Sequence, residues 1–304
     1  MKEFVINENS GGQRTDKFIA KLMPKLPKSM MYKGFRKKCV KLNGKHIKDG
    51  SVFIEEGDVL QLYFRDEFFE NDPEFRYIKP KLDIVYEDEN ILVINKAAGI
   101  VVHADERNTG ITLINMVQSY LFENNEYDPD KEQTFRPALC NRLDRNTGGL
   151  VIAAKNARAL RDMNERIRTR EVRKLYKAVV EGYPGESGHL EGFAVRNEKV
   201  TAVSANESDN SRAVSLDYRV ISQKNGYSLV EIELHTGRTH QIRAQFSAAG
   251  CPLAGDTKYG GHGGRFRQAL WSVGLEFDFK DNDFSLGYLN GKKIAVEAPF
   301  EKEF

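Results

Sequence analysis

The segments SRAVSLDYRVIS (211–222) and YSLVEIELHT (227–236) constrain the fold most, because they predict two long strands that pair across a short connection. Similar apolar segments recur through residues 82–298, and turns separate most of them. Helical spacing is confined to the ranges 109–122, 156–171 and 238–250. This order favours an α+β body with a mixed, mainly antiparallel sheet over a regularly alternating α/β fold. Residues 185–211 are polar and irregular, and we expect them to form a flexible flap.

The charge along the chain separates this body from a basic N-terminal part. Between Gly11 and Gly50 there are twelve basic and two acidic residues, a net charge of +10, so the rest of the +2 chain carries −8. A basic module on a mildly acidic body indicates an arm that binds a polyanion, although a solvated lysine-rich face would look the same. An acidic and aromatic stretch at 65–80 separates the basic part from the α+β body. We predict a basic domain at 1–66, a linker at 67–80 and a catalytic or structural domain at 81–304.

The basic part has its own pattern of helices and turns. Thr15 or Asp16 could cap a helix through KFIAKLM, and Ser29 could cap a second helix through MMYKGFRKK. The pair Asn43-Gly44 predicts a hairpin, and two short strands flank the turn at 56–58. With its segments SMMYKGFRKKCVKLNGK and EEGD, this helix, helix, small-sheet order resembles the S4 RNA-binding domain over about residues 12–64.

The resemblance to this small α/β domain implies that structured RNA is the partner. The basic side chains concentrate on the second helix and the hairpin, where they can contact phosphates. We therefore expect the RNA-binding residues of this part to be Lys28, Lys33, Arg36, Lys37, Lys38, Lys41 and Lys45.

Several classes of protein and site are disfavoured. No apolar stretch approaches the ~18–20 residues that span a bilayer, and the N-terminus lacks the apolar core of a signal peptide, so we expect a cytoplasmic protein without membrane contacts. The three cysteines lie far apart and form no Cys-x-x-Cys pair, which indicates reduced thiols. The six histidines lack the spacing of metal ligands, and no phosphate-binding loop or nucleophile elbow is present. We expect neither a metal nor a cofactor.

The segment NRLDRNTGGL (141–150) contains the residue that decides the function. Asp144 lies between Arg142 and Arg145 in a segment too rich in glycine for a helix. Such Arg-x-Asp-Arg strings commonly form solvated ion pairs of little energetic value. From these ten residues alone, Asp144 is either a surface ion pair or the working carboxylate of an active site.

Four further segments accompany it in a fixed order. They are INKAAGIVVHAD (94–105), RKLYK (173–177), HTGRTHQIR (235–243) and CPLAGDTKYGG (251–261). Together with NRLDRNTGGL, these motifs resemble in order and spacing those of the RluA-type pseudouridine synthases, over about residues 82–300. A preceding S4-like domain is typical of the RluC and RluD branches, which act on large-subunit ribosomal RNA.

The resemblance implies the fold of that family, no cofactor, and a role for four side chains. Asp144 matches the catalytic carboxylate and Arg238 the arginine that pairs with it, while Tyr176 matches the aromatic residue that stacks on the flipped uracil. Arg142 matches the arginine inserted into the RNA in place of that base. Arginine suits the pairing role because its charge is permanent and its fork orients a carboxylate. For His240, Gln241 and Arg243, capping and lining the following helix is an equally good interpretation.

Four positions depart from the family pattern, and they are Ala97, Asn141, Asn146 and Gly148. None of these departures removes the four side chains, but a Gly-Gly pair at 148–149 is expected to lower the order of the loop. The sequence thus predicts an RNA pseudouridine synthase, acting as a monomer on ribosomal RNA. A non-catalytic RNA-binding or ribosome-assembly factor, and the same activity on transfer RNA, are the alternatives.

Overall fold

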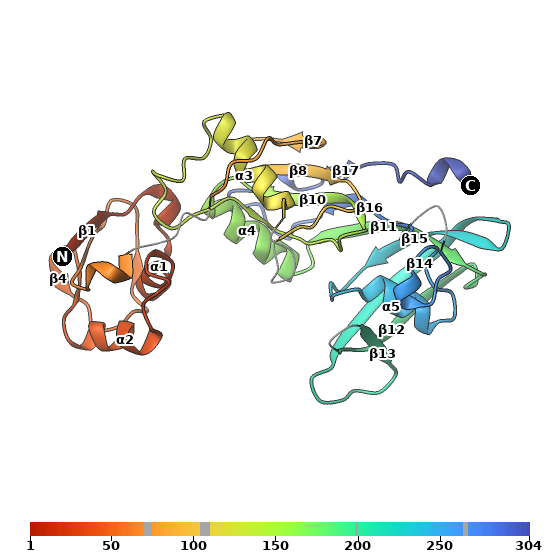
Figure 1. The fold of residues 1–304 in the computed structure, drawn as a ribbon, viewed down its shortest axis with the longest axis horizontal. Helices are drawn as coiled ribbons and strands as arrows, with labels where there is room; N and C mark the ends of the chain where they lie inside the picture. Colours follow the sequence, from red (N-terminus) through yellow and green to blue (C-terminus); the bar gives the residue numbers. More distant parts are fainter. Residues whose placement is uncertain (70–74, 104–109, 198–199, 264–266) are drawn as a thin grey trace. The chain divides into compact units, whose positions relative to one another are not determined.

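The structure is a computed structural model that describes residues 1–69, 75–103, 110–197, 200–263 and 267–304 (Figure 1). Its contacts divide the chain into two compact units. Unit 1 comprises Met1–Pro80, Asn115–Ala138 and Lys155–Arg158, and unit 2 comprises Lys81–Ile114, Leu139–Ala154 and Ala159–Phe304. Residues 70–74 of the expected linker, and the end of the motif at 94–105, lie outside the described residues.

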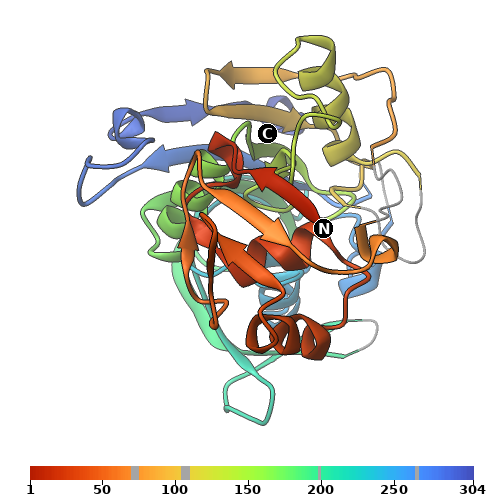
Figure 2. The ribbon, with the colours of Figure 1, turned by 90° about the vertical axis from the view of Figure 1, so that its left-hand side faces the viewer.

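Unit 1 is built around a small antiparallel sheet with the strand order β1-β6-β3-β4 (Figure 2). A second sheet pairs β2 with β5, and two helices contribute Phe18, Ile19 and Phe35 to the buried core. The strands are β1 (Lys2–Val5), β2 (Gln13–Arg14), β3 (Val40–Leu42), β4 (Lys45–His46), β5 (Phe53–Ile54) and β6 (Val59–Leu62), and the helices are α1 (Thr15–Leu22) and α2 (Lys28–Arg36).

The local predictions for this unit are largely confirmed, with one correction. Asn43 and Gly44 both have positive φ, 50° and 76°, as the tight turn between β3 and β4 requires. The helix caps, however, are wrong: α1 follows Arg14 and α2 follows Pro27, neither cap makes a side-chain hydrogen bond, and Ser29 lies inside α2. The Thr15 hydroxyl instead donates to the carbonyl of Val52 at 2.8 Å, and Pro27 takes the position before α2 with a φ of −59° that its ring fixes.

Unit 1 also includes a later part of the chain. The Asn9 side-chain amide donates a hydrogen bond of 2.6 Å to Glu132, and the Ile78 amide donates one of 3.0 Å to Ser119 in α3 (Leu113–Glu123). The N-terminal residues therefore pack against residues 115–138 and form more than an isolated arm.

Unit 2 contains a sheet of eleven strands with the order β13-β12-β14-β15-β11-β16-β10-β8-β7, to which β17 and β9 add at β16 and β10. The pair β10 and β16 is parallel, and the other neighbours along this order and the pair β16–β17 are antiparallel, so the prediction of a mixed, mainly antiparallel α+β fold is confirmed. The strands are β7 (Ile84–Glu87), β8 (Ile91–Lys96), β9 (Ala138–Leu139), β10 (Gly148–Ala154), β11 (Val172–Glu181), β12 (Ser187–Arg196), β13 (Thr201–Ser204), β14 (Arg212–Lys224), β15 (Tyr227–Leu234), β16 (Leu270–Phe277) and β17 (Lys293–Ala295).

Two helices cover parts of this sheet. Met163 of α4 (Ala157–Arg168) lies in a buried cluster with residues of β8, β10 and β16, including Val93, Ile152 and Phe277. At the other end of the sheet, α5 (Gln241–Ala248) contacts β12 and β13 (Figure 1). Short 3-10 turns occur at Glu8–Ser10, Asp66–Phe69, Thr257–Tyr259, Gly287–Leu289 and Glu301–Glu303. Within the described residues, no helix has both the length and the apolar character needed to cross a membrane.

The expectation of an irregular flap at 185–211 is wrong. Most of this segment forms β12 and β13, and β12 pairs with β14 from Ser187–Arg219 to Ala194–Arg212. Main-chain hydrogen bonds give the strand its order, so its polar side chains did not reveal it. Gly188 permits the close approach of Tyr218, which a Cβ would meet at 2.8 Å. Residues 198–199 lie outside the described part of the chain.

The Gly148-Gly149 pair is likewise part of a strand. Both glycines lie buried at the start of β10, opposite Trp271 and Ser272 of β16. A Cβ on Gly148 would lie 2.2 Å from the Trp271 ring, and Gly149 has a φ of +106° with Ser272 O 2.1 Å from a Cβ. The close approach of the two strands therefore requires both glycines, and the expected loss of order at this pair is not found.

Candidate functional site

A cavity of about 250 Å³ lies in unit 2 at the segment before β10. Four predicted site residues line it together, namely Arg142, Asp144, Tyr176 and Arg238. The cavity also exposes side chains that the sequence did not single out as partners of Asp144, including His240 and Arg243. It combines a carboxylate, several cations and an aromatic side chain, which together suit a polar, anionic substrate with a flat ring.

Backbone contacts hold the segment that carries Asp144. Lys96 is buried, and its Nζ donates hydrogen bonds to the carbonyl oxygens of Ala97, Ile100 and Arg145 at 3.0–3.1 Å. The Gly99 amide donates to the same Arg145 carbonyl at 2.7 Å. Burial lowers the pKa of Lys96 to about 8. This lysine therefore joins the turn after β8 to the residue that follows Asp144.

Asn141 fastens the other end of the segment. Its side-chain amide donates to the carbonyl of Leu150 at 3.2 Å, and its oxygen accepts from the amide of Ile152 at 2.8 Å. Both partners lie in β10, so the Asn141 side chain bonds the main chain of β10 in the way that a neighbouring strand would. The departure from the family pattern at Asn141 thus has a structural role.

Asp144 pairs with Arg243, and this corrects the expected partner. Arg243 Nη1 donates to Asp144 Oδ2 at 2.9 Å, while Nε and Nη2 donate to Asp256 at 2.6 and 2.9 Å. Arg243 also lies over the ring of Tyr259, 4.7 Å from its centroid. Burial opposes the charge on Arg243, but the two carboxylates raise its pKa above the usual value.

Arg238, which was expected in this position, is exposed at the cavity. Its side chain forms no ion pair with a carboxylate of the described residues. The helix explains the difference: Arg243 lies in the first turn of α5, which faces Asp144, whereas Arg238 precedes the helix. Its backbone amide donates to Gln241 Oε1 at 3.0 Å, so the turn itself is well fixed.

His240 is the second neighbour of Asp144. Its Nε2 lies 3.8 Å from Asp144 Oδ2, and its Nδ1 lies 2.8 Å from the hydroxyl of Tyr259. Burial, with Arg243 and other cations nearby, lowers the pKa of His240 to about 4 despite the opposing effect of Asp144. The imidazole is consequently neutral near pH 7, and the charge beside Asp144 comes from Arg243. His240 has a φ of 56°, a left-handed conformation that places it just before α5.

Tyr176 forms the aromatic wall of the cavity. It lies on β11 next to an irregularity in the pairing with β16 between Leu175 and Tyr176, a feature that re-aims side chains. The tyrosine is buried, and this burial raises its pKa to about 12. It therefore presents a neutral ring at physiological pH. Arg142, in contrast, is exposed at the cavity.

The predicted phosphate-binding residues are found in unit 1. They are exposed, except for the half-buried Lys41, whose Nζ lies 5.3 Å from the centroid of the Tyr63 ring. Within the described part of the chain, none of them forms an ion pair. These cations lie on α2, on the residues that follow it, and on the β3–β4 hairpin. They are Lys28, Lys33, Arg36, Lys37, Lys38, Lys41 and Lys45.

The site residues that sequence reasoning missed are Lys96, Arg243 and Asp256. Each lies within a motif that had been recognised, but no residue pattern in those motifs indicates the Asp144–Arg243–Asp256 chain. The sequence offered no clear signal for Arg243, because its pairing with Asp144 depends on where α5 begins, and His240 lies outside that helix.

Comparison with known proteins gives consistent matches. The family model described as RNA pseudouridylate synthase matches residues 90–248. An uncharacterized RNA pseudouridine synthase of Mycoplasma capricolum is 30% identical over 97% of both chains. Ribosomal large subunit pseudouridine synthase D of Pseudomonas aeruginosa is 33% identical over 84% of this chain and 76% of its own. Human RNA pseudouridylate synthase domain containing 1 has a similar fold, with a TM-score of 0.58 and 23% identity over 73% of this chain and 86% of its own.

Proposed function

Because the chain belongs to the RNA pseudouridylate synthase family, we propose that it isomerises specific uridines of large-subunit ribosomal RNA with Asp144 as the catalytic carboxylate. The observation that carries this proposal is the ion pair of 2.9 Å between Asp144 and Arg243 inside a cavity walled by Tyr176. The Asp144 carboxylate is only one-fifth exposed and has a permanent cation beside it. This environment is typical of a reactive group and not of a solvated surface ion pair.

The reaction requires one carboxylate and no redox partner. The bond between uracil N1 and ribose C1′ breaks, the base turns, and a bond between C5 and C1′ forms, while C5 loses a proton and N1 gains one. Asp144 supplies either a nucleophile for C1′ or a base for the C2′ proton, which gives a glycal intermediate. Arg243 orients the carboxylate for both routes, because its other two donors are fixed on Asp256.

The target base must leave the RNA stack before it can reach Asp144. Tyr176 is a neutral, buried ring in the cavity, and we assign it the stacking contact with the flipped uracil. Arg142 is exposed at the same cavity, where it can fill the gap that the base leaves. Arg238 is exposed as well, and its guanidinium is free to contact a phosphate beside the flipped nucleotide.

Two observations support ribosomal RNA as the substrate. Two relatives that are 31% and 33% identical over 84% of this chain are named ribosomal large subunit pseudouridine synthase D. The seven cations of unit 1 are exposed or half-buried, so they are available for phosphate contacts with a large structured RNA, as the resemblance to the S4 domain implies.

The test is modification of transcribed large-subunit ribosomal RNA by the wild type and by Asp144→Asn, with every pseudouridine mapped. The amide retains the shape of the side chain but can neither attack C1′ nor accept a proton, so we expect modification to be abolished with RNA affinity nearly unchanged. Pseudouridine formation by a folded Asp144→Asn protein excludes Asp144 as the catalytic group. Modification of transfer RNA alone by the wild type excludes the proposed substrate.

A further inference from the structure

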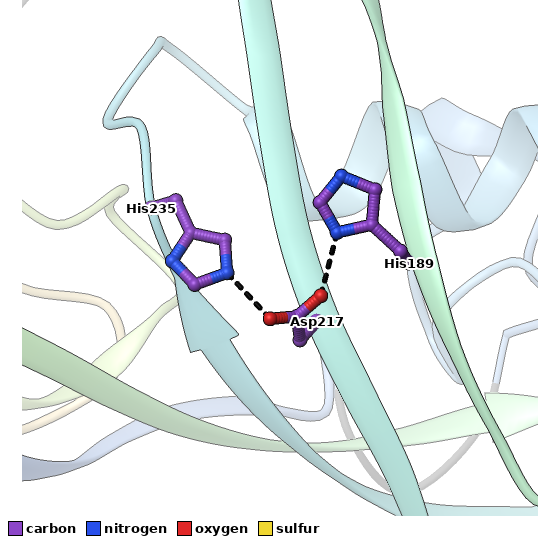
Figure 3. A group of neighbouring side chains, drawn as sticks. All are labelled: His189, Asp217 and His235. Carbon is purple, nitrogen blue, oxygen red and sulfur yellow. Dashed lines mark hydrogen bonds and ion pairs between the residues drawn. The ribbon is translucent and has the colours of Figure 1, made fainter.

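His189, Asp217 and His235 lie together on the large sheet although they are far apart in the sequence (Figure 3). His189 Nδ1 lies 2.6 Å from one oxygen of Asp217, and His235 Nε2 lies 2.7 Å from the other. One nitrogen of each ring and one carboxylate oxygen all lie within 4.8 Å of one another. The cluster therefore directs two imidazoles and one carboxylate toward a common point.

Three neighbouring strands position these side chains: His189 lies near the start of β12, Asp217 in the middle of β14, and His235 directly after β15. His189 on β12 lies directly opposite Asp217 on β14, and Asp217 lies opposite Glu233, two residues before His235. The next residue on β14, Tyr218, contacts Phe246 of α5 with ring centroids 5.4 Å apart. Since neighbouring residues of a strand point to opposite faces, Asp217 faces away from α5. The cluster is thus separate from the Asp144 cavity, which Leu234 lines from the other face.

We propose that His189, Asp217 and His235 form a binding site for a first-row divalent transition-metal ion, of which Zn²⁺ fits best. Two imidazoles with one carboxylate is a common ligand set for Zn²⁺, and its fourth position would be open to water. Mg²⁺ and Ca²⁺ are excluded because they prefer oxygen ligands. The long sequence separations of the ligands explain why spacing alone predicted no metal site.

Small movements suffice to convert the hydrogen-bonded cluster into a coordination site. Ligand bonds of about 2.0–2.1 Å in a tetrahedron put neighbouring donor atoms roughly 3.3 Å apart. The contacts of 2.6 and 2.7 Å to Asp217 must therefore lengthen by about 0.6–0.7 Å, and ligand atoms that lie as much as 4.8 Å apart must approach by about 1.5 Å. An ion that replaces the shared protons would bring about both changes. The side chains are 47%, 52% and 30% exposed, so they have room for this movement and an open path for the ion.

The surroundings favour a cation. Asp217 lies between the two imidazoles and accepts a hydrogen bond from each, at 2.6 and 2.7 Å, so its carboxylate faces the common site. Glu191 Oε2 lies 3.7 Å from His189 Nε2, the nitrogen that points away from the common site. A carboxylate in that place commonly orients a metal-bound histidine and raises its basicity.

Titration of the reduced, full-length protein with Zn²⁺ by isothermal calorimetry tests the site. A Cys39→Ser/Cys140→Ser background removes the two half-buried thiols, and Mg²⁺ serves as the control ion. We expect one Zn²⁺ per chain, no Mg²⁺ at the same concentration, and a higher melting temperature with Zn²⁺. His189→Gln and His235→Gln should each weaken Zn²⁺ binding by more than about tenfold, because losing even an outer-shell partner costs that much.

His262→Gln is the matched control. His262 is also exposed and bonded to a carboxylate, Glu181, but it has no second histidine beside it in the described structure. Its replacement should leave Zn²⁺ affinity unchanged. Glutamine can still donate a hydrogen bond to Asp217, so the variants should fold, and unliganded melting temperatures check this. Equal Zn²⁺ binding by the wild type and by the His189→Gln/His235→Gln double variant would overturn the proposal and leave only a hydrogen-bonded triad.

Discussion

Arg243 is bound to Asp256 by two hydrogen bonds of 2.6 and 2.9 Å, and both side chains are buried. One guanidinium nitrogen is left to face Asp144 at 2.9 Å. Asp256 therefore fixes the plane of the guanidinium, and the guanidinium fixes Asp144. Arginine is needed for this chain because a single ammonium cannot make directed bonds to two carboxylates in this geometry.

Arg243→Lys should slow single-turnover pseudouridine formation roughly tenfold to a hundredfold, since losing a hydrogen bond to a charged group costs about 1.5–3 kcal/mol. Arg238→Lys retains an exposed positive charge and should change the rate much less, with its main effect on RNA binding. Rates at saturating enzyme separate the two effects, and melting temperatures show whether Arg243→Lys is folded. If Arg238→Lys is the slower variant, the pairing inferred from sequence is the functional one.

Tyr176→Phe should retain the rate within about threefold, because the ring that stacks on a base is preserved. Tyr176→Leu should lose about 1–3 kcal/mol, a decrease of roughly fivefold to 150-fold in the single-turnover rate on the same RNA. The phenol has a pKa of about 12 and is not available as a base near pH 7. A large loss in the phenylalanine variant would contradict the stacking role and point to the hydroxyl.

His240 should make the protein less stable as the pH falls. Its folded pKa is about 4, below the unfolded value of 6.5, so between these values the unfolded chain binds the proton and the folded chain does not. The free energy of unfolding therefore decreases from pH 6.5 toward pH 4 through this residue. His240→Asn, which tolerates the left-handed backbone, should lose less stability between pH 7 and pH 5 in urea unfolding. An equal decrease in the free energy of unfolding of both proteins would show that the burial of His240 does not determine the stability between pH 7 and pH 5.

Neutralising Lys33, Arg36 and Lys37 to glutamine should weaken RNA binding and flatten its salt dependence. The log–log slope should fall by about 0.7 for each phosphate of single-stranded RNA that the variant no longer neutralises, and by somewhat more for helical RNA. The matched control neutralises Arg168, Arg219 and Lys293, which are exposed but already paired with Glu165, Glu231 and Glu276. Both triple variants change the charge equally, so similar slopes would mean that the α2 surface does not bind RNA.

Alternating apolar residues predicted most strands of the body, and helical spacing predicted its three described helices, because burial of one face is visible in the sequence. β12 was missed because Gly188 and Gly192 occupy two of the less exposed positions of its alternating pattern, so few apolar side chains mark its buried face, and pairing with β14 supplies its order. The motifs identified Asp144 and Tyr176, which line one cavity. They did not identify Arg243 as the partner of Asp144, since that pairing depends on where α5 begins. Cross-strand register, which brings His189 to Asp217, is likewise not encoded by spacing.

The parallel pairing of Gly148 with Trp271 has a consequence for the order of folding. The pairing of β8 with β10 joins Lys96 to Gly149, whereas β16 begins only at Leu270, so β8 and β10 close the shorter loop and can pair first. Contacts between such distant segments form late, because a long loop must first be closed. A nascent chain that ends before β16 lacks the neighbour against which the start of β10, shortly after Asp144, is packed. We therefore expect catalytic competence to arise only when nearly the whole chain has left the ribosome that is making it.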